Sequence, residues 1–234
     1  MINKIGDLLD LEKELKVNFN DKNLLKIAIT HSSYAKEKKK DKYNERLEFL
    51  GDSVLQIIIS EYLFSNYENK KEGELTKKRS LIVCENSLFE IAQKWGVGSY
   101  MLMSNGEDAT GGRNRTSILS DSVEAIIAAI YLDKGIKFTT KFVLKNFMDI
   151  INRAMEDKIV LDYKTKLQEV LQKNGVAKIT YALIKSEGPP HKRKFYVSVL
   201  YEKDIIGEGT GFSKKDAEQE AAKIALKNMG EIDG

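Results

Sequence analysis

Two short segments of the chain place acidic residues on helices that are otherwise apolar. Glu45, Glu48 and Asp52 are spaced at i, i+3 and i+7, which puts them within an arc of roughly 60° on one side of a helix. The second segment repeats the pattern with Asp121 and Glu124. Because unpaired carboxylates are expensive to bury, two such helices can pack together only if a cation lies between their acidic stripes.

The residues around each stripe indicate whether the acids face solvent or protein. A solvated helix edge is the alternative interpretation of each stripe. The neighbours, however, are large and apolar: Leu47, Phe49, Leu50, Val54, Leu55, Ile57 and Ile58 in the first segment, and Val123, Ile126, Ile127, Ile130 and Tyr131 in the second. The repetition of the pattern also favours a metal site. We therefore expect the first acidic helix to be mostly buried, its acids included.

The side chains available as ligands narrow the choice of metal. Neither acidic segment contains His or Cys, so every donor would be oxygen. Oxygen donors suit hard cations such as Mg²⁺ or Mn²⁺ rather than Zn²⁺ or copper. Helical di-iron proteins would need Glu-x-x-His repeats, and neither segment contains one.

Composition sets outer limits on the fold and on the cellular compartment. The 234 residues, of which 42% are hydrophobic, allow one large domain or two ordinary ones. The balance of 38 basic to 35 acidic residues gives no argument for nucleic acid by itself. The single Cys84 excludes an internal disulfide, and neither a signal-peptide core nor an apolar run near 18 residues is present. We expect a cytoplasmic protein with no membrane segment.

Helical periodicity dominates the first two thirds of the chain. Beyond two short helices marked by apolar residues over 8–15 and 24–28, the second with Asn20 or Asp21 as its N-cap, the pattern predicts helices from Glu45 to about 67, over 76–95, over 117–133 and from about 137. The last helix ends near residue 155. We therefore expect an all-α domain over 1–152, a linker over 153–160 and a second domain over 161–230.

The second domain follows a different pattern. A helix over 162–173 ends at Asn174-Gly175, and alternating strands follow over 178–186, 194–201 and 205–212. A final helix begins after Ser213 as the N-cap. The order helix, three strands, helix predicts a small α+β domain (α-β-β-β-α).

Two loops precede the acidic helices. Residues 36–42 include five Lys, and residues 105–116 include Gly111-Gly112-Arg113-Asn114-Arg115. Each is consistent with an ordinary solvated loop. Both lie near the acidic helices, however, where an anionic substrate would need positive charge.

Three features of the second domain suit a nucleic-acid duplex. Gly188-Pro189-Pro190-His191 predicts a stiff turn that presents His191, and Lys192-Arg193-Lys194 follows it. Lys214 and Lys215 begin the last helix, where free amides also attract phosphate. The first helix of this domain carries a polar stripe on one face that suits contact with minor-groove 2′-hydroxyls: Thr165, Gln168, Glu169 and Gln172. A lone basic pair is usually only solvated, but the three features together favour duplex RNA.

These segments resemble a known family over essentially the whole chain and in the right order. Residues 44–53, Asn-Glu-Arg-Leu-Glu-Phe-Leu-Gly-Asp-Ser, are similar to the signature of bacterial ribonuclease III, and residues 121–125 match its second acidic motif. The Gly-Pro-Pro-His turn and residues 214–222 resemble the double-stranded-RNA-binding domain that follows the nuclease domain in that family.

The resemblance implies a homodimeric endoribonuclease that cuts both strands of double-stranded RNA. It implies 5′-phosphate products with two-nucleotide 3′ overhangs and a role in processing rRNA and mRNA precursors. Mg²⁺, for which Mn²⁺ would substitute, would be held by four carboxylates: Glu48, Asp52, Asp121 and Glu124. Asp52 and Glu124 would also be catalytic, with Glu45 as an auxiliary acid. Two metal ions would activate a water and stabilise the leaving 3′-oxygen, so the carboxylates need not act as nucleophiles.

Some positions carry the resemblance less well. Glu72 falls where the family often has another acid near the dimer valley, although its surroundings predict an ordinary surface turn. Tyr43 stands where many members have His, and the metal chemistry does not depend on it. His31, the one His of the first domain, is expected to be structural.

Other interpretations remain open on sequence grounds. The chain could be a non-catalytic duplex-RNA-binding regulator, a class that loss of any of the four acids would have favoured. An all-α Mg²⁺ enzyme acting on diphosphates would leave the second domain unexplained. The apolar residues that follow Asp52 suit either a dimer interface or the core of one chain: Ile57, Ile58, Ile59, Tyr62, Leu63 and Phe64.

Overall fold

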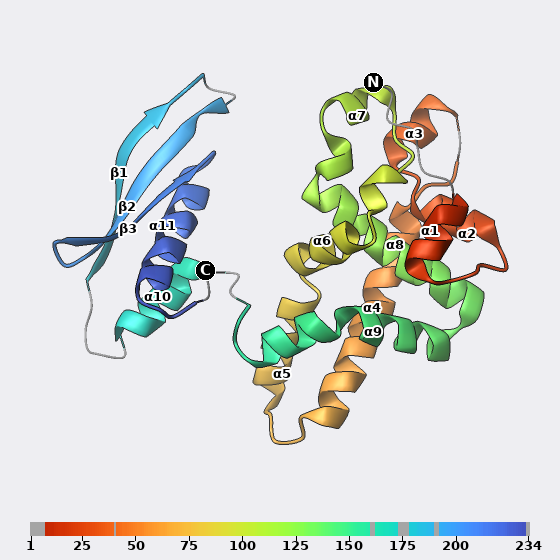
Figure 1. Ribbon diagram of the computed structural model, residues 1–234, viewed down its shortest axis with the longest axis horizontal. Coiled ribbons are helices and arrows are strands. Elements are labelled where there is room, and N and C mark those ends of the chain that lie inside the picture. The colour runs from red at the N-terminus through yellow and green to blue at the C-terminus, as the bar shows by residue number, and fades with distance from the viewer. Residues whose placement is uncertain (1–7, 40, 160–161, 173–177, 190–191, 233–234) are drawn as a thin grey trace. The chain divides into compact units, whose positions relative to one another are not determined.

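The computed structural model describes residues 8–39, 41–159, 162–172, 178–189 and 192–232 (Figure 1). Two compact units divide the chain, Met1–Met155 and Glu156–Gly234. The described part of the first is helical and the second combines helices with a sheet, so the predicted fold class is confirmed. Helix α9 continues through residues 153–155 of the expected linker; the limits 1–152, 153–160 and 161–230 stay a prediction.

The first unit is built from helices joined by short turns. Its elements are α1 (Leu8–Leu15), α2 (Lys22–Ala28), α3 (Ser32–Glu37), α4 (Glu45–Asn66), α5 (Glu72–Ile82), α6 (Glu85–Lys94), α7 (Asn105–Ala109), α8 (Thr116–Lys134) and α9 (Ile136–Met155), with 3₁₀ turns at Val97–Ser99 and Gly112–Asn114. Within the described ranges, the helices are all too short or too polar to cross a membrane.

The predicted single helix over 76–95 is wrong, because the chain forms α5 and α6 there with a break between them. Cys84 adopts an extended conformation (φ −72°, ψ 159°) and begins the second helix. The hydroxyl of Ser87 donates to the Leu81 carbonyl at 2.8 Å, so it satisfies a carbonyl that the interrupted helix leaves without its usual partner.

Helix α8 is the central element of the first unit. It packs against α2, α4, α6 and α9, and its residues 125–130 are fully buried. Helix α4 lies along α8 and buries Leu55, Ile58 and Ile59. The expectation that α4 is mostly buried, its acids included, is wrong for Glu45 and for the side of the helix that carries Phe49 and Phe64, since all three residues are exposed.

The second unit has the predicted order of elements: α10 (Tyr163–Gln172), β1 (Ile179–Glu187), β2 (Lys194–Tyr201), β3 (Asp204–Gly211) and α11 (Lys214–Asn228). The strands form an antiparallel sheet in the order β1-β2-β3. Both helices lie on one face of this sheet (Figure 1). Leu167, Val197 and Leu226 belong to the buried core between them.

Glycines bring α11 directly onto β3. A Cβ at Gly209 would lie 2.1 Å from the backbone nitrogen of Ala221, and a Cβ at Gly211 would lie 2.6 Å from that of Ala217. Only glycine allows a strand and a helix to approach so closely. The start of α11, with Lys214 and Lys215, is therefore held at the end of β3.

Candidate functional site

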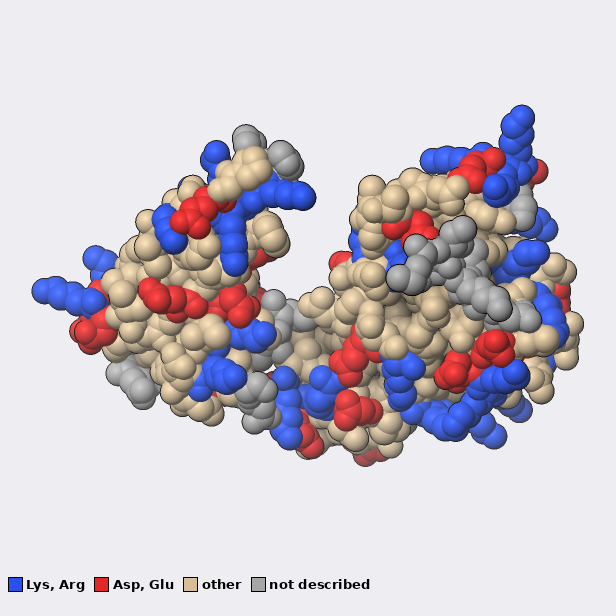
Figure 2. Space-filling model, turned by 45° about the horizontal axis from the view of Figure 1, so that its top comes forward, with Lys and Arg blue, Asp and Glu red and all other residues tan. Residues whose placement is uncertain are grey.

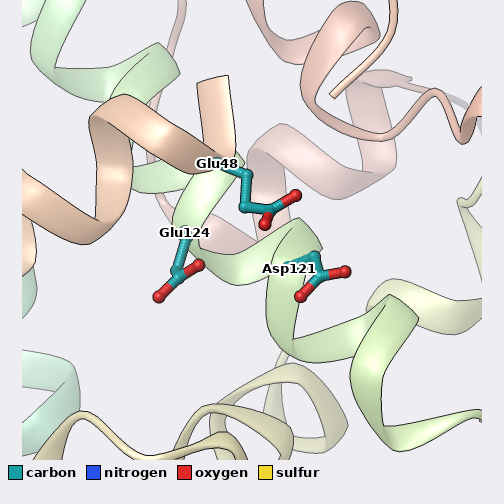
Figure 3. Close-up of side chains that lie close together, drawn as sticks. All are labelled: Glu48, Asp121 and Glu124. Atoms are coloured by element: carbon teal, nitrogen blue, oxygen red, sulfur yellow. The ribbon is translucent and has the colours of Figure 1, made fainter. Parts of the chain in front are cut away.

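Three carboxylates from two helices converge in the first unit. Glu48 extends from α4 toward Asp121 and Glu124 on α8 (Figure 3), and one oxygen of each lies within 4.8 Å of the others. All three side chains are half-buried. Three oxygen donors at this spacing can hold a hard divalent cation between them.

A glycine sets the separation of the two helices at this group. A Cβ at Gly51 would lie 1.9 Å from the backbone oxygen of Glu124, so any other residue there would push α4 away from α8. Gly51 stands one helical turn after Glu48. The close backbone approach therefore brings the carboxylate of Glu48 within reach of the two acids on α8.

The electrostatics of the group favour added positive charge. Burial, followed by the charges of Asp52 and Glu48, raises the pKa of Glu124 to about 8. Burial also raises the pKa values of Glu48 and Asp121, with further contributions from neighbouring acids. Among the residues that the structure describes, Lys and Arg form no ion pair with Glu48, Asp121 or Glu124. The donor set and its charge thus fit a divalent metal ion.

The other two acids of the first stripe lie outside this trio. Asp52 accepts hydrogen bonds at 2.8 and 3.0 Å from the Nε2 of Gln56, although its charge acts more strongly on Glu124 than that of any other residue. Glu45 is exposed at the start of α4. Its charge raises the pKa values of both Glu48 and Asp121, so it lies near the group.

The basic residues of the loop before α8 are bound to the protein itself. The Nε of Arg113 donates to both oxygens of Asp108 at 2.9 Å, and its Nη1 donates to the carbonyls of Gly98 and Met101. Arg115 forms an ion pair with Glu107. These two cations hold the loop in place, which argues against the expectation that they provide free positive charge for an anionic substrate.

His31 also takes part in local structure. Its Nδ1 accepts from the backbone nitrogen of Ser33 at the start of α3, and the hydroxyl of Ser33 in turn accepts from the backbone nitrogen of Ser104. The charge of His31 partly offsets the rise in the pKa of Asp121 that burial and the charge of Glu85 cause. His31 therefore links the α2–α3 turn to the segment after residue 101 and lies near the carboxylates.

Sequence reasoning missed three residues of this site. Gly51 carried a signal, because glycine is a poor helix former and occurs here in the middle of an apolar helix. Gln56 offered none, since a polar residue four positions after Asp52 is common on helix surfaces. Glu85 begins α6, and its charge raises the pKa of Asp121. Because Glu85 lies far along the chain from both acidic segments, no signal in the sequence indicated that it lies near them.

Glu72 lies apart from the three carboxylates. It is the first residue of α5 and accepts from the hydroxyl of Thr76. With Phe64 and Arg79 it lines a groove of about 790 Å³ between the end of α4 and the start of α5.

Most of the predicted binding residues of the second unit are exposed. Thr165 and Gln168 of α10 and Lys215 of α11 line one hollow of about 490 Å³. The remaining residues that the structure describes are also exposed: Glu169, Lys192, Lys194 and Lys214. His191 lies outside the described residues. On the unit at the left of Figure 2, Lys and Arg side chains alternate with Asp and Glu.

A hydrogen-bond clamp fixes α10 against α11. Asp162 accepts from the backbone nitrogen and the hydroxyl of Thr165, and the Nε2 of Gln219 donates to the same carboxylate at 2.9 Å. The Oε1 of Gln219 accepts from the backbone nitrogen of Tyr163 at 2.8 Å. The clamp sets the spacing between the polar stripe of α10 and the lysines of α11.

Comparison with known proteins agrees with this architecture. A protein-family model described as ribonuclease-III-like matches residues 21–151, and the family model of the double-stranded RNA binding motif matches residues 163–229. The protein named Ribonuclease 3 of Clostridium tetani is 60% identical over 97% of both chains, and that of Clostridium perfringens is 56% identical over 97% of this chain and 95% of its own. The solved nuclease domain of ribonuclease III from Campylobacter jejuni is 43% identical, with a TM-score of 0.58, and covers 61% of this chain and 97% of its own. The chain therefore belongs to the ribonuclease III family of endoribonucleases.

Proposed function

We propose that this chain is a Mg²⁺-dependent endoribonuclease that cuts double-stranded RNA, with Mn²⁺ as an acceptable substitute. The observation that carries the proposal is the group formed by Glu48, Asp121 and Glu124. Its carboxylate oxygens lie within 4.8 Å of one another, and among the described residues no Lys or Arg pairs with them. A hard cation stabilises such a group, because without one the neighbouring carboxylates repel each other.

The acids around the group have different proposed roles. Glu48, Asp121 and Glu124 hold the metal, and Asp52 joins them as the fourth carboxylate, because it lies near enough for its charge to raise the pKa of Glu124. Asp52 and Glu124 are the proposed catalytic acids. Glu45, at the exposed start of α4, is the auxiliary acid that adds negative charge to the site. A divalent ion held by these carboxylates would activate a water molecule and neutralise charge on the reacting phosphate.

The proton on Glu124 gives this residue a further role. With its pKa at about 8, Glu124 carries a proton at neutral pH in the absence of metal. It must release that proton to become a ligand. Metal binding and deprotonation of the Glu124 carboxyl are therefore coupled.

The second unit is the proposed reader of the duplex. Thr165, Gln168 and Glu169 would face the 2′-hydroxyls of the minor groove, and the lysines Lys192, Lys194, Lys214 and Lys215 would contact phosphates. His191 is proposed as a groove contact on the sequence alone. Because A-form RNA exposes little base information in its grooves, recognition by shape is expected.

A homodimer is the proposed working form, since cutting two strands needs two acidic groups related by symmetry. Phe49, Ile57 and Phe64 of α4 are 79%, 58% and 75% exposed. At 100° per residue they fall within an arc of roughly 80° beside the acidic stripe. An exposed apolar stripe of this kind suits an isologous contact with a second copy. Ile58, Ile59 and Leu63 are buried within the chain and belong to its core.

The proposed products are 5′-phosphates with two-nucleotide 3′ overhangs, and the proposed substrates are paired regions of rRNA and mRNA precursors. Both follow from the family. Sequencing the RNA ends that accumulate after depletion of the protein tests them. Unprocessed precursors with paired flanks are expected, and an unchanged set of ends would contradict the assignment.

The activity itself is tested with a long RNA duplex in Mg²⁺ or in Ca²⁺. Binding in both ions and cleavage only in Mg²⁺ are expected for the wild-type chain. Glu124→Gln, which keeps the shape but removes the charge, should bind the duplex with wild-type affinity and lose cleavage. Binding without cleavage by the wild type in Mg²⁺ would instead identify a non-catalytic duplex-binding protein.

A further inference from the structure

Phe212 is an exposed aromatic residue between β3 and α11. Its side chain is 75% exposed, and it stands between Gly211, the last residue of β3, and Ser213, the N-cap of α11. In this position an apolar side chain often packs on the fourth residue of the helix as a hydrophobic staple. That residue is Ala217, which is fully buried, whereas the Phe212 ring remains in solvent. The ring therefore contributes little to the cap.

The backbone on both sides of Phe212 is firmly held. Gly211 packs so closely on α11 that a Cβ there would lie 2.6 Å from the Ala217 nitrogen. The hydroxyl of Ser213 accepts from the backbone nitrogen of Asp216 at 3.1 Å and donates to its carboxylate at 2.7 Å. An exposed ring on so rigid a support loses little conformational freedom when it meets a ligand.

Exposed lysines lie on both sides of this ring. Gly211 pairs with Phe195 in the sheet, so the residues just before Phe195, among them Lys194, lie at the same end of the sheet as Phe212. Lys192 and Lys194 are exposed there. On the other side, Lys214 and Lys215 follow directly at the exposed start of α11. Phe212 is thus an exposed apolar residue among four exposed lysines, and the neighbouring acids are Glu187, opposite Lys194 in the sheet, and Asp216 in the first turn of α11.

We propose that Phe212 packs on a ribose of the duplex RNA between the phosphates that the neighbouring lysines contact. This inference rests on the proposed function of the second unit. Inside a duplex the base faces are already stacked, and phosphate is unfavourable against the negative face of an aromatic ring. The C–H face of the ribose is the apolar surface that the backbone offers between phosphates.

The proposal predicts an affinity loss that is independent of salt. The probe is an RNA duplex closed by loops at both ends, which removes stacking on a terminal base pair, and the full chain binds it in Ca²⁺. Phe212→Ala should weaken binding about tenfold, because the variant lacks the apolar side chain that becomes buried when the wild-type chain binds RNA. The slope of log Kd against log salt should not change, because no phosphate contact is lost. Phe212→Leu should retain most of the affinity.

Two control variants separate this effect from others. Ile205→Ala removes a side chain that is 60% exposed at the opposite end of the sheet, where Ile205 pairs with Leu200, and should leave affinity unchanged. Lys214→Ala should weaken binding and reduce the salt slope. Wild-type affinity in Phe212→Ala, or an equal loss in Ile205→Ala, would overturn the proposal. Failure of the wild-type chain to bind the closed duplex would instead contradict the proposed function.

Discussion

Gly51 shows how one residue sets the geometry of the carboxylate group. Glycine inside a helix normally costs about 0.5 to 1 kcal/mol relative to alanine, yet a Cβ here would lie 1.9 Å from the Glu124 carbonyl oxygen. We expect Gly51→Ala to destabilise the first unit by about 1 to 3 kcal/mol, as overpacking does. It should also separate Glu48 from Asp121. Thermal unfolding and the rate of duplex cleavage in Mg²⁺ measure the two effects.

A second glycine provides the control for this substitution. Gly73 lies in the first turn of α5, and a Cβ there would meet nothing within 4 Å. Gly73→Ala should be neutral or slightly stabilising and should cleave at the wild-type rate. If Gly51→Ala behaved in the same way, the close contact between α4 and α8 would not control the site.

Glu124 makes the stability of the metal-free protein depend on pH. Its pKa is raised from 4.5 in a free side chain to about 8 in the folded chain. Between these values the folded state binds a proton that the unfolded state has lost, so stability falls as pH rises from about 4.5 to about 8 and then levels. In EDTA, Glu124→Gln should flatten this decline, as followed by melting temperature at intervals across the range. Parallel curves for the two proteins would show that Glu124 does not carry the proton.

The site could be predicted from the sequence only in part, and the limit lies in side-chain orientation. The spacing of Glu48, Asp121 and Glu124 placed them on helix faces, and packing of α4 on α8 brings them together. Residue spacing cannot distinguish a carboxylate that points toward the other acids from one that is hydrogen-bonded to a neighbouring side chain. Asp52 is on the same face as Glu48, but in the structure it is bound by Gln56.

At the scale of helices and strands, clear sequence signals gave correct predictions. The strand β2 matches its predicted range of 194–201, and Ser213 caps α11 as expected. The break between α5 and α6 was missed because no Gly or Pro marks it. It depends instead on the Ser87 hydroxyl reaching the Leu81 carbonyl, a contact that becomes available only once the chain has turned.

The clamp at the start of α10 should stabilise the second unit and hold the polar stripe that we propose binds the duplex. We expect Asp162→Ala to cost about 1 kcal/mol, as loss of an N-cap does, and to speed hydrogen exchange of the amides at Tyr163–Thr165. The bonds from Gln219 and Thr165 lower the pKa of Asp162 to about 2. Its contribution is therefore complete above pH 3.8 and is lost as pH falls toward 2.

Exchange measured by mass spectrometry on the full chain tests the clamp. Asp204→Ala, a change at the exposed start of β3, is the matched control and should leave exchange in α10 unchanged. Equal protection of α10 in Asp162→Ala and in the wild type would show that Asp162 does not hold the helix.

At the scale of the whole molecule, the exposed stripe of α4 predicts how copies associate. Phe64→Glu places a charge on the stripe far from the acids and should convert a dimer into a monomer in sedimentation velocity. Phe138→Glu changes a partly exposed aromatic residue of α9 outside the stripe and should leave a dimer. A dimeric Phe64→Glu variant would place the interface elsewhere.

A mixed dimer tests whether each copy cuts one strand. One copy would be wild type and the other would carry Glu124→Gln, with different tags allowing the pair to be isolated. If each acidic group serves one strand, this dimer should nick the duplex and leave the other strand intact, because only one complete carboxylate group remains. Denaturing and native gels distinguish a nick from a double cut. Double cutting at the rate of the wild-type dimer would mean that a single carboxylate group cuts both strands in turn. In that case, cleavage of both strands would not require a dimer.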